Sequence, residues 1–94
     1  MQKDDTNIVL VGNRPFMNYV MAIVTQLTIK DQTEVVIKAR GLYIVKAIDA
    51  IEYVRKKQIP NLLLCNIVID SMEAVNKEGR KNRFSIFEAT LKKS

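Results

Sequence analysis

The chain of 94 residues contains no histidine, no tryptophan and a single cysteine, Cys65. Without histidine it cannot build a Ser-His-Asp triad or a mixed Cys/His zinc site. One cysteine cannot form an internal disulfide, which is typical of proteins in a reducing compartment. Only three glycines are present, far apart, so no glycine-rich phosphate loop occurs. We therefore expect a protein that is not an enzyme, with no metal, no cofactor and no small-molecule substrate.

Long apolar runs are also missing, and none approaches the roughly 20 residues that a membrane-spanning helix needs. The first seven residues are polar and acidic, unlike a signal or transit peptide. We expect a cytoplasmic protein that makes no contact with membranes. A chain of this length predicts a single domain, spanning residues 1–94.

Basic residues outnumber acidic ones, with 15 lysines and arginines against 10 aspartates and glutamates. The net charge of +5 comes from the last two thirds of the chain, because the side chains of residues 1–33 are neutral in sum. The densest cluster is Lys77, Arg80, Lys81 and Arg83. Such clustering is typical of a polyanion-binding protein, although a basic face that only maintains solubility produces the same pattern.

Strand and helix patterns alternate along the first two thirds of the sequence. Residues 8–11 are an apolar run that predicts a strand buried on both faces. Pro15 suits the first position of a helix that fades at residues 28–29. β-Branched residues predict a second strand over 34–39. The apolar spacing from Ile44 onward predicts a second helix from about Leu42 to Lys57, which Pro60 terminates.

The last third predicts a long hairpin. Residues 62–75 read as a strand with a bulge near Cys65 and Asn66, where Cys65 is a small buried residue. Residues 76–83 read as the tip, with Gly79 as the turn residue, and residues 84–92 as the returning strand. The order β-α-β-α-β-β predicts an α/β fold, an α+β sandwich with two helices on one face of a four-stranded mixed sheet. The C-terminal β-hairpin should project beyond the body.

Two cations, Lys38 and Arg40, lie where the second strand is expected to turn into the second helix. Gly41 permits the sharp change of backbone direction. The N-terminus of a helix favours negative charge, so cations placed there gain nothing locally and predict an external anion. The outer face of the second helix should carry Lys46, Asp49, Glu52 and Lys56. Glu52 is expected to pair with Arg55 and Lys56.

Two sequence blocks resemble one family. They are Asn13-Arg14-Pro15-Phe16-Met17-Asn18-Tyr19-Val20 and Val36-Ile37-Lys38-Ala39-Arg40-Gly41. The chain is similar to Alba, the small basic chromatin protein of archaea, and the similarity extends in order through most of the sequence.

The resemblance implies a fold like the C-terminal domain of a bacterial translation initiation factor, and a homodimer. It implies binding to double-stranded DNA largely without sequence specificity, through phosphates and the minor groove, with DNA condensation on the chromosome. RNA binding is implied as well. Carried over by position, the nucleic-acid-binding residues are Arg14, Lys38, Arg40, Arg80 and Arg83. Charge and position alone add Lys77 and Lys81.

Three positions depart from the family pattern. Asn13 stands where the family commonly has a lysine that can be acetylated, so that switch should be absent. Leu42 follows Gly41 where an arginine is common. Gln58 stands where members that polymerise along DNA have a phenylalanine. These departures predict weaker, more salt-sensitive and less cooperative binding.

Two alternatives to duplex DNA binding stay open. One is an RNA-binding or ribonucleoprotein role on the same basic surface, with Tyr43 as a weak candidate for base stacking and a helix-packing residue otherwise. The other is a structural dimer or protein-interaction module whose basic loops serve only solubility.

Overall fold

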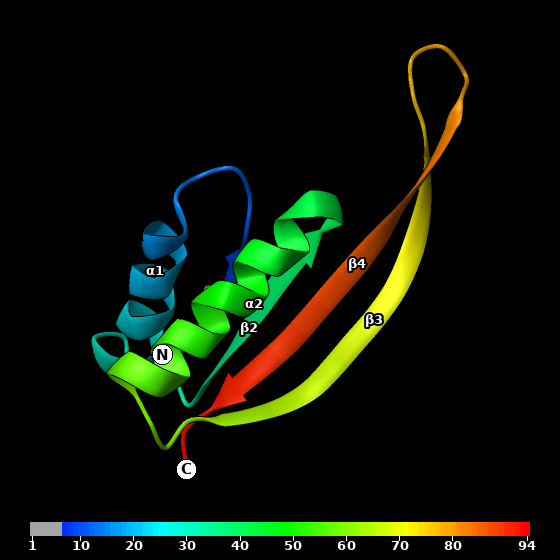
Figure 1. Cartoon of the computed structure of the whole chain (residues 1–94). Coiled ribbons are helices and arrows are strands. Elements are labelled where there is room, and N and C mark those ends of the chain that lie inside the picture. Colours follow the sequence, from blue (N-terminus) through cyan, green and yellow to red (C-terminus); the bar gives the residue numbers. More distant parts are fainter. Residues whose placement is uncertain (1–6) are drawn as a thin grey trace.

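The computed structural model describes residues 7–94 and shows two helices packed on one face of a four-stranded sheet (Figure 1). The strand order is β1-β2-β4-β3, with β1 parallel to β2 and the other neighbours antiparallel. The predicted element order and layer arrangement are confirmed; the polar segment 1–6 lies outside the described residues. The elements are β1 (Ile8–Leu10), α1 (Phe16–Thr28), β2 (Glu34–Arg40), α2 (Ile44–Tyr53), β3 (Leu63–Val75) and β4 (Lys81–Lys92).

The core lies between the helices and the face of the sheet that they cover. On the strands, alternate residues such as Ile37 and Leu91 are fully buried, because successive side chains of a strand point to opposite faces. On α1, Val20, Ile23 and Leu27 are fully buried at helical spacing. No helix among residues 7–94 is long and apolar enough to cross a membrane.

The first strand and the first helix differ from the prediction in detail. Only Val9 of β1 is buried, whereas Ile8 and Leu10 are 40% and 70% exposed. The prediction of burial on both faces was wrong because the helices cover a single face of the sheet. Pro15 precedes α1 with extended backbone angles (φ −56°, ψ 146°), so it is not the first helical residue.

The second helix is shorter than predicted and is flanked by two other kinds of turn. Gly41–Tyr43 form a 3-10 turn, and Gly41 has a φ of +59°, as its predicted role in the change of direction requires. After α2, residues Val54–Gln58 form a wide π-type turn, closed by the Ile59 N–H donating to the Val54 carbonyl at 2.7 Å. The helical segment ends before Pro60, as predicted.

The long hairpin is confirmed, with its bulge between Cys65 and Val68. Asn66 has a φ of +50°, a left-handed conformation that asparagine tolerates better than most residues. Cys65 is half-buried, which corrects its expected full burial. The turn contains Gly79 at a φ of +80°, and β4 begins at Lys81, so the predicted tip of residues 76–83 was too long.

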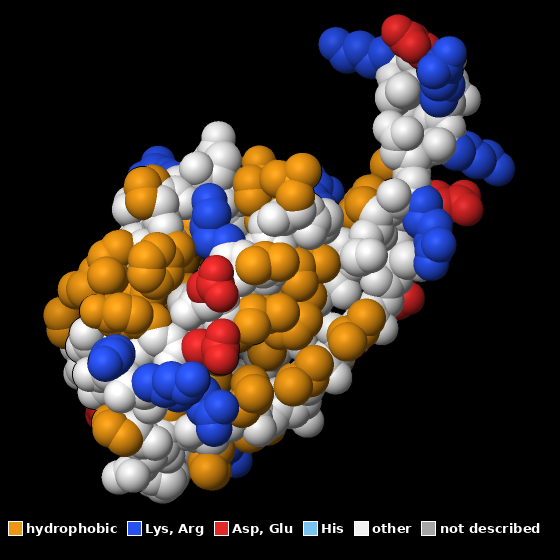
Figure 2. Space-filling model, viewed as in Figure 1, with side chains coloured by type: hydrophobic (Ala, Val, Ile, Leu, Met, Phe, Trp, Pro, Cys, Tyr) orange, Lys and Arg blue, Asp and Glu red, His pale blue; other side chains and the backbone are white. Residues whose placement is uncertain are grey.

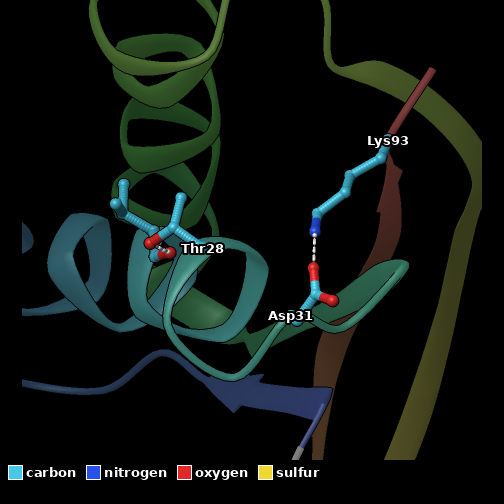
Figure 3. Close-up of polar contacts among 4 residues, drawn as sticks. Thr28, Asp31 and Lys93 are labelled. Carbon is cyan, nitrogen blue, oxygen red and sulfur yellow. Dashed lines mark hydrogen bonds and ion pairs between the residues drawn. The ribbon is translucent and has the colours of Figure 1, made fainter.

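An ion pair joins the end of β4 to the connection between α1 and β2 (Figure 3). The Lys93 ammonium donates to an Asp31 carboxylate oxygen at 2.8 Å. This hydrogen bond and the positive charge of Lys93 lower the pKa of Asp31. Asp31 has a φ of +52° and lies in the turn between α1 and β2, where the Gln32 N–H donates to the Gln26 carbonyl at 2.9 Å.

Candidate nucleic-acid interface

The cations that the sequence singled out lie toward one end of the sheet. Strands β1 and β2 are parallel, so the loop carrying Arg14 and the end of β2 carrying Arg40 are adjacent. The Val11 N–H donates to the Lys38 carbonyl at 2.9 Å and fixes this neighbourhood. The β3–β4 hairpin extends beyond the body from the same end (Figure 1).

The projecting part of the hairpin, residues 73–83, is here called the arm. All of its side chains are exposed, and lysine and arginine side chains surround its tip (Figure 2). The tip is built around Asn76, whose backbone N–H donates to the Arg80 carbonyl at 2.9 Å. The side-chain oxygen of Asn76 accepts hydrogen bonds from the Glu78 and Arg80 N–H groups, at 3.0 and 2.9 Å. The arm thus ends in a closed, hydrogen-bonded turn.

Charge on the arm is predominantly positive, with two carboxylates, Glu73 and Glu78, among the cations. Glu73 is in register with Arg83, so the two share one face of the ribbon. Among residues 7–94, the salt bridges involve other residues and leave the arm cations without a paired carboxylate. The cations of the arm are Lys77, Arg80, Lys81 and Arg83.

Lys38 does not lie at the strand-to-helix turn where it was predicted. It lies within β2, in register with Glu88 of β4, on the face of the sheet opposite the helices. Its ammonium is 3.9 Å from a Glu88 carboxylate oxygen, and the two side chains are 41% and 36% exposed. An ion pair this long and this exposed is weak, so Lys38 can exchange Glu88 for an external anion.

Arg40, the last residue of β2, is exposed and lies beside the start of the arm. Its guanidinium carbon is 5.3 Å from the centre of the Phe84 ring, a cation–π distance. Leu10, Met72 and Phe84 line a shallow groove of about 450 Å³ next to this cation. The aromatic ring limits the conformations of a long, flexible side chain while leaving its N–H donors toward solvent.

Arg14 is exposed in the loop between β1 and α1, and the backbone of this loop is held by two side chains. The Tyr19 hydroxyl oxygen accepts from the Gly12 and Arg14 N–H groups, at 2.9 and 3.2 Å. The Lys46 ammonium donates to the Gly12 and Arg14 carbonyls, at 3.0 and 2.7 Å. Lys46 shares an open surface of α2 with Asp49, Glu52 and Lys56, as predicted, but it is half-buried and its bonds to the loop were not predicted. Helical spacing places Lys46 next to Tyr43 but gives no sign of the distant loop.

The remaining polar and aromatic side chains of α2 and of the wide turn after it have different partners. Glu52 pairs with Lys56 at 3.8 Å, as predicted. Arg55 instead donates to the Leu62 carbonyl at 3.2 Å, which ties the wide turn to the start of β3. Tyr43 is half-buried and packs against the core, in agreement with its expected packing role. Gln58 is exposed at the end of the wide turn.

These features define a class of protein: a small two-layer α/β protein with an exposed basic arm and further cations where the arm joins the body. Among residues 7–94, no group of three or more His, Cys, Asp or Glu side chains could hold a metal ion. The arrangement offers guanidinium and ammonium donors spread over an extended surface, which suits a polyanion better than a compact ligand.

Comparison with known proteins identifies the family. The Alba family model matches residues 7–70. The chain is 39% identical over 89 residues to the DNA/RNA-binding protein Alba of Methanocella arvoryzae, covering 95% of this chain and 92% of that protein. It is 43% identical over 76 residues to the DNA/RNA-binding protein Alba 1 of Archaeoglobus fulgidus, covering 81% of this chain and 84% of the relative. The solved structure of Alba from Thermoplasma volcanium superposes with a TM-score of 0.84 at 38% identity, covering 92% of this chain and 99% of that one. The chain therefore belongs to the Alba family, as its two sequence blocks indicated.

Proposed function

We propose that this protein binds double-stranded DNA as a homodimer, largely without sequence specificity, and contributes to compaction of the chromosome in the cytoplasm. The observation that carries the proposal is the exposed arm, whose cations have no paired carboxylate among residues 7–94 and which projects from the end of the sheet where β2 ends and the β1–α1 loop begins. The relatives named as DNA/RNA-binding proteins support it. Residues 1–94 would act as one nucleic-acid-binding domain without catalytic activity.

In this proposal the arm follows the minor groove, and the body lies over the duplex. The minor groove is only about 6 Å wide, so the cations on the arm reach the phosphates that flank it. Phosphate contacts carry no sequence information in themselves, which accounts for binding that is largely independent of sequence. The contacting residues would be Arg14, Lys38, Arg40, Lys77, Arg80, Lys81 and Arg83.

Release of condensed counterions supplies the driving force. Each neutralised phosphate adds roughly 0.9 to the negative slope of log K against log salt. With five to seven candidate cations per subunit, of which only some engage, we expect a slope on the order of −4 to −8 per dimer. A gel-shift titration of duplex DNA across salt concentrations measures this slope. Binding that does not change between low and physiological salt would contradict the proposal.

The homodimer is supported by apolar side chains that the helices leave uncovered. Ile69 of β3 is 78% exposed, although it faces the helix side of the sheet opposite the buried Phe87. Leu64 on the same strand and Val45 and Ile48 on α2 are exposed as well. Hydrophobic side chains are gathered around α2 and between α2 and β3 (Figure 2). A second copy that covers this surface would remove apolar area from water and present two arms to one duplex.

A matched pair of variants tests the dimer. Ile69→Asp places a charge in the proposed interface, whereas Ile29→Asp places the same charge at an equally exposed position (79%) after α1. We expect Ile69→Asp to shift the mass measured by light scattering toward the monomer, with Ile29→Asp unchanged. Equal masses for both variants and the parent protein would place the interface elsewhere.

RNA binding by the same surface is the second candidate, and the relatives' names give it specific support. Exposed ammonium and guanidinium groups contact RNA phosphates as readily as DNA phosphates. Competition of labelled duplex DNA against structured RNA shows which of the two nucleic acids the protein binds more tightly. A preference for RNA above about tenfold, or roughly 1.4 kcal/mol, would make RNA the principal target.

If the protein is instead a protein-interaction module whose basic loops serve only solubility, loss of these cations should not change nucleic-acid affinity. Replacing Lys38 and Arg40 by alanine should weaken nucleic-acid binding if these cations contact phosphates. Unchanged affinity in a folded double variant would favour the interaction module.

A further inference from the structure

We infer that Lys46 and Tyr19 are positioning residues that hold the β1–α1 loop so that Arg14 meets a phosphate. The inference rests on the proposed function, because it assigns a task to two side chains that do not themselves contact the nucleic acid. The loop, residues 12–15, is short and exposed, yet four of its backbone polar groups bond to only two side chains.

Tyr19 binds the two backbone N–H groups of the loop from the side of the core. It is only 8% exposed on α1, so its ring is fixed by the core. Its hydroxyl oxygen accepts two hydrogen bonds, from the Gly12 and Arg14 N–H groups. Because the Tyr19 ring is fixed in the core, its hydroxyl group holds the loop backbone at a defined position next to α1.

Lys46, on α2, binds the two backbone carbonyl groups of the loop. Its ammonium donates to the Gly12 and Arg14 carbonyls and lies 6.0 and 5.6 Å from the ring centres of Tyr19 and Tyr43. Two of its three N–H donors are therefore used within the protein, and the two rings shield the charge. These contacts orient the ammonium toward the loop, whereas a phosphate contact needs donors that face outward.

These contacts fix the backbone of Arg14. Its N–H is held by Tyr19 and its carbonyl by Lys46, and Pro15 fixes the next φ angle. Only the side chain of Arg14 then has to become ordered when a phosphate arrives. Preorganisation of this kind strengthens binding by reducing the entropy lost in the complex.

A double-mutant cycle distinguishes positioning from direct contact. Duplex affinity is measured at about 0.1 M salt for the parent protein, Arg14→Ala, Lys46→Met and the combined variant. Arg14→Ala removes two phosphate contacts from the proposed dimer, which contribute about 1.8 to the slope and so about 60-fold in affinity between 1 M and 0.1 M salt. We expect Lys46→Met alone to lose no more affinity than Arg14→Ala, and to lose less than twofold when added to Arg14→Ala. Multiplicative losses would overturn the inference and make Lys46 a phosphate contact itself.

Matched controls accompany the cycle. Lys30→Met removes the same charge from an exposed position after α1 and should leave duplex affinity within about twofold. Lys46→Arg retains a cation with several N–H donors and should restore most of the affinity lost in Lys46→Met. Failure of Lys46→Arg to restore affinity, with the fold intact, would count against the loop contacts.

A second readout needs no nucleic acid. Hydrogen exchange of the Gly12 and Arg14 amides is followed by NMR in the free protein and in the Tyr19→Phe and Lys46→Met variants. We expect at least tenfold faster exchange at these two amides, with the buried α1 amides of Val20 and Ile23 unchanged. Unchanged exchange at Gly12 and Arg14 would overturn the inference. If the protein bound no nucleic acid at all, the proposed function would fail while this measurement still reported on the loop.

Discussion

Removing two cations from one face of the arm tests how much of the binding the arm carries. Lys81 and Arg83 lie two residues apart on β4, so their side chains point to the same face of the ribbon. Both are exposed and neither takes part in the salt bridges of residues 7–94. Replacing both by alanine therefore removes two charges per subunit with little effect on the packed body. We expect the free energy of unfolding to change by no more than about 0.5 kcal/mol.

The expected effect on binding follows from counterion release. Four phosphate contacts in a dimer contribute about 3.6 to the salt slope, and two contribute about 1.8. Arg83 faces Glu73 in register across the ribbon, so part of its charge is offset in the free protein. We therefore expect the slope of the Lys81→Ala/Arg83→Ala variant to be less steep by between about 1.8 and 3.6.

The assay is duplex affinity at four or more salt concentrations, compared with a control of equal charge change. Lys30→Ala/Lys92→Ala removes two exposed cations at the opposite end of the molecule, where β4 ends. If only net charge mattered, the control would flatten the slope as much as the arm variant does. That result would refute the arm as the site of contact.

Three further predictions concern a weak ion pair, the core and the titration of one carboxylate. Glu88→Gln should release Lys38 and raise duplex affinity at low salt. The gain should be up to about fivefold for each subunit of the dimer, because exposed ion pairs are worth up to about 1 kcal/mol. No gain in a gel-shift titration would mean that Lys38 does not contact DNA. Leu91→Ala removes a fully buried side chain and should lower the free energy of unfolding in denaturant titrations by about 2–5 kcal/mol; the exposed Leu42→Ala is the control. Lys93 lowers the pKa of Asp31, so this pair stabilises the fold above the ordinary carboxyl pKa of 3.8 and loses that effect as the pH falls through the lowered pKa. Asp31→Asn should therefore lower Tm at neutral pH, with the difference disappearing in acid, and a difference that persists there would have another origin.

The sequence predicted the fold well because local patterns and the layer arrangement agree. Alternation along Glu34–Arg40 and the helical spacing from Ile44 each identify one buried face, and both faces meet in the same core. Gly41 and Gly79 were predicted at turns and both have positive φ, whereas the positive φ angles of Asp31 and Asn66 were not predicted. Boundaries were less certain, as at Pro15 and Lys81, because the end of an element depends on a few hydrogen bonds.

The candidate site could be predicted only in part. The basic arm could be predicted, because its cations cluster around a turn residue within one stretch of sequence. The partners of individual cations were not predictable, since Glu88 is 50 residues from Lys38, and the loop carbonyls that Lys46 holds are 34 and 32 residues away. These contacts depend on strand register and on the packing of the helices, which local spacing does not encode.

The body cations and the arm cations therefore differ in what they contact within the free protein. Lys38 must leave Glu88, whereas the arm cations form no salt bridge among residues 7–94 and only Arg83 has a carboxylate, Glu73, opposite it in register. Arg40 is ordered by Phe84, and Arg14 by a loop that Lys46 and Tyr19 hold. In the proposed complex, the arm then supplies most of the salt-dependent attraction, and the preordered arginines of the body fix the orientation of the duplex. Because Asn13 and Leu42 add no charge to the body, substitutions on the arm should change the salt slope most. Substitutions around Arg14 should instead affect how well a bound duplex is aligned.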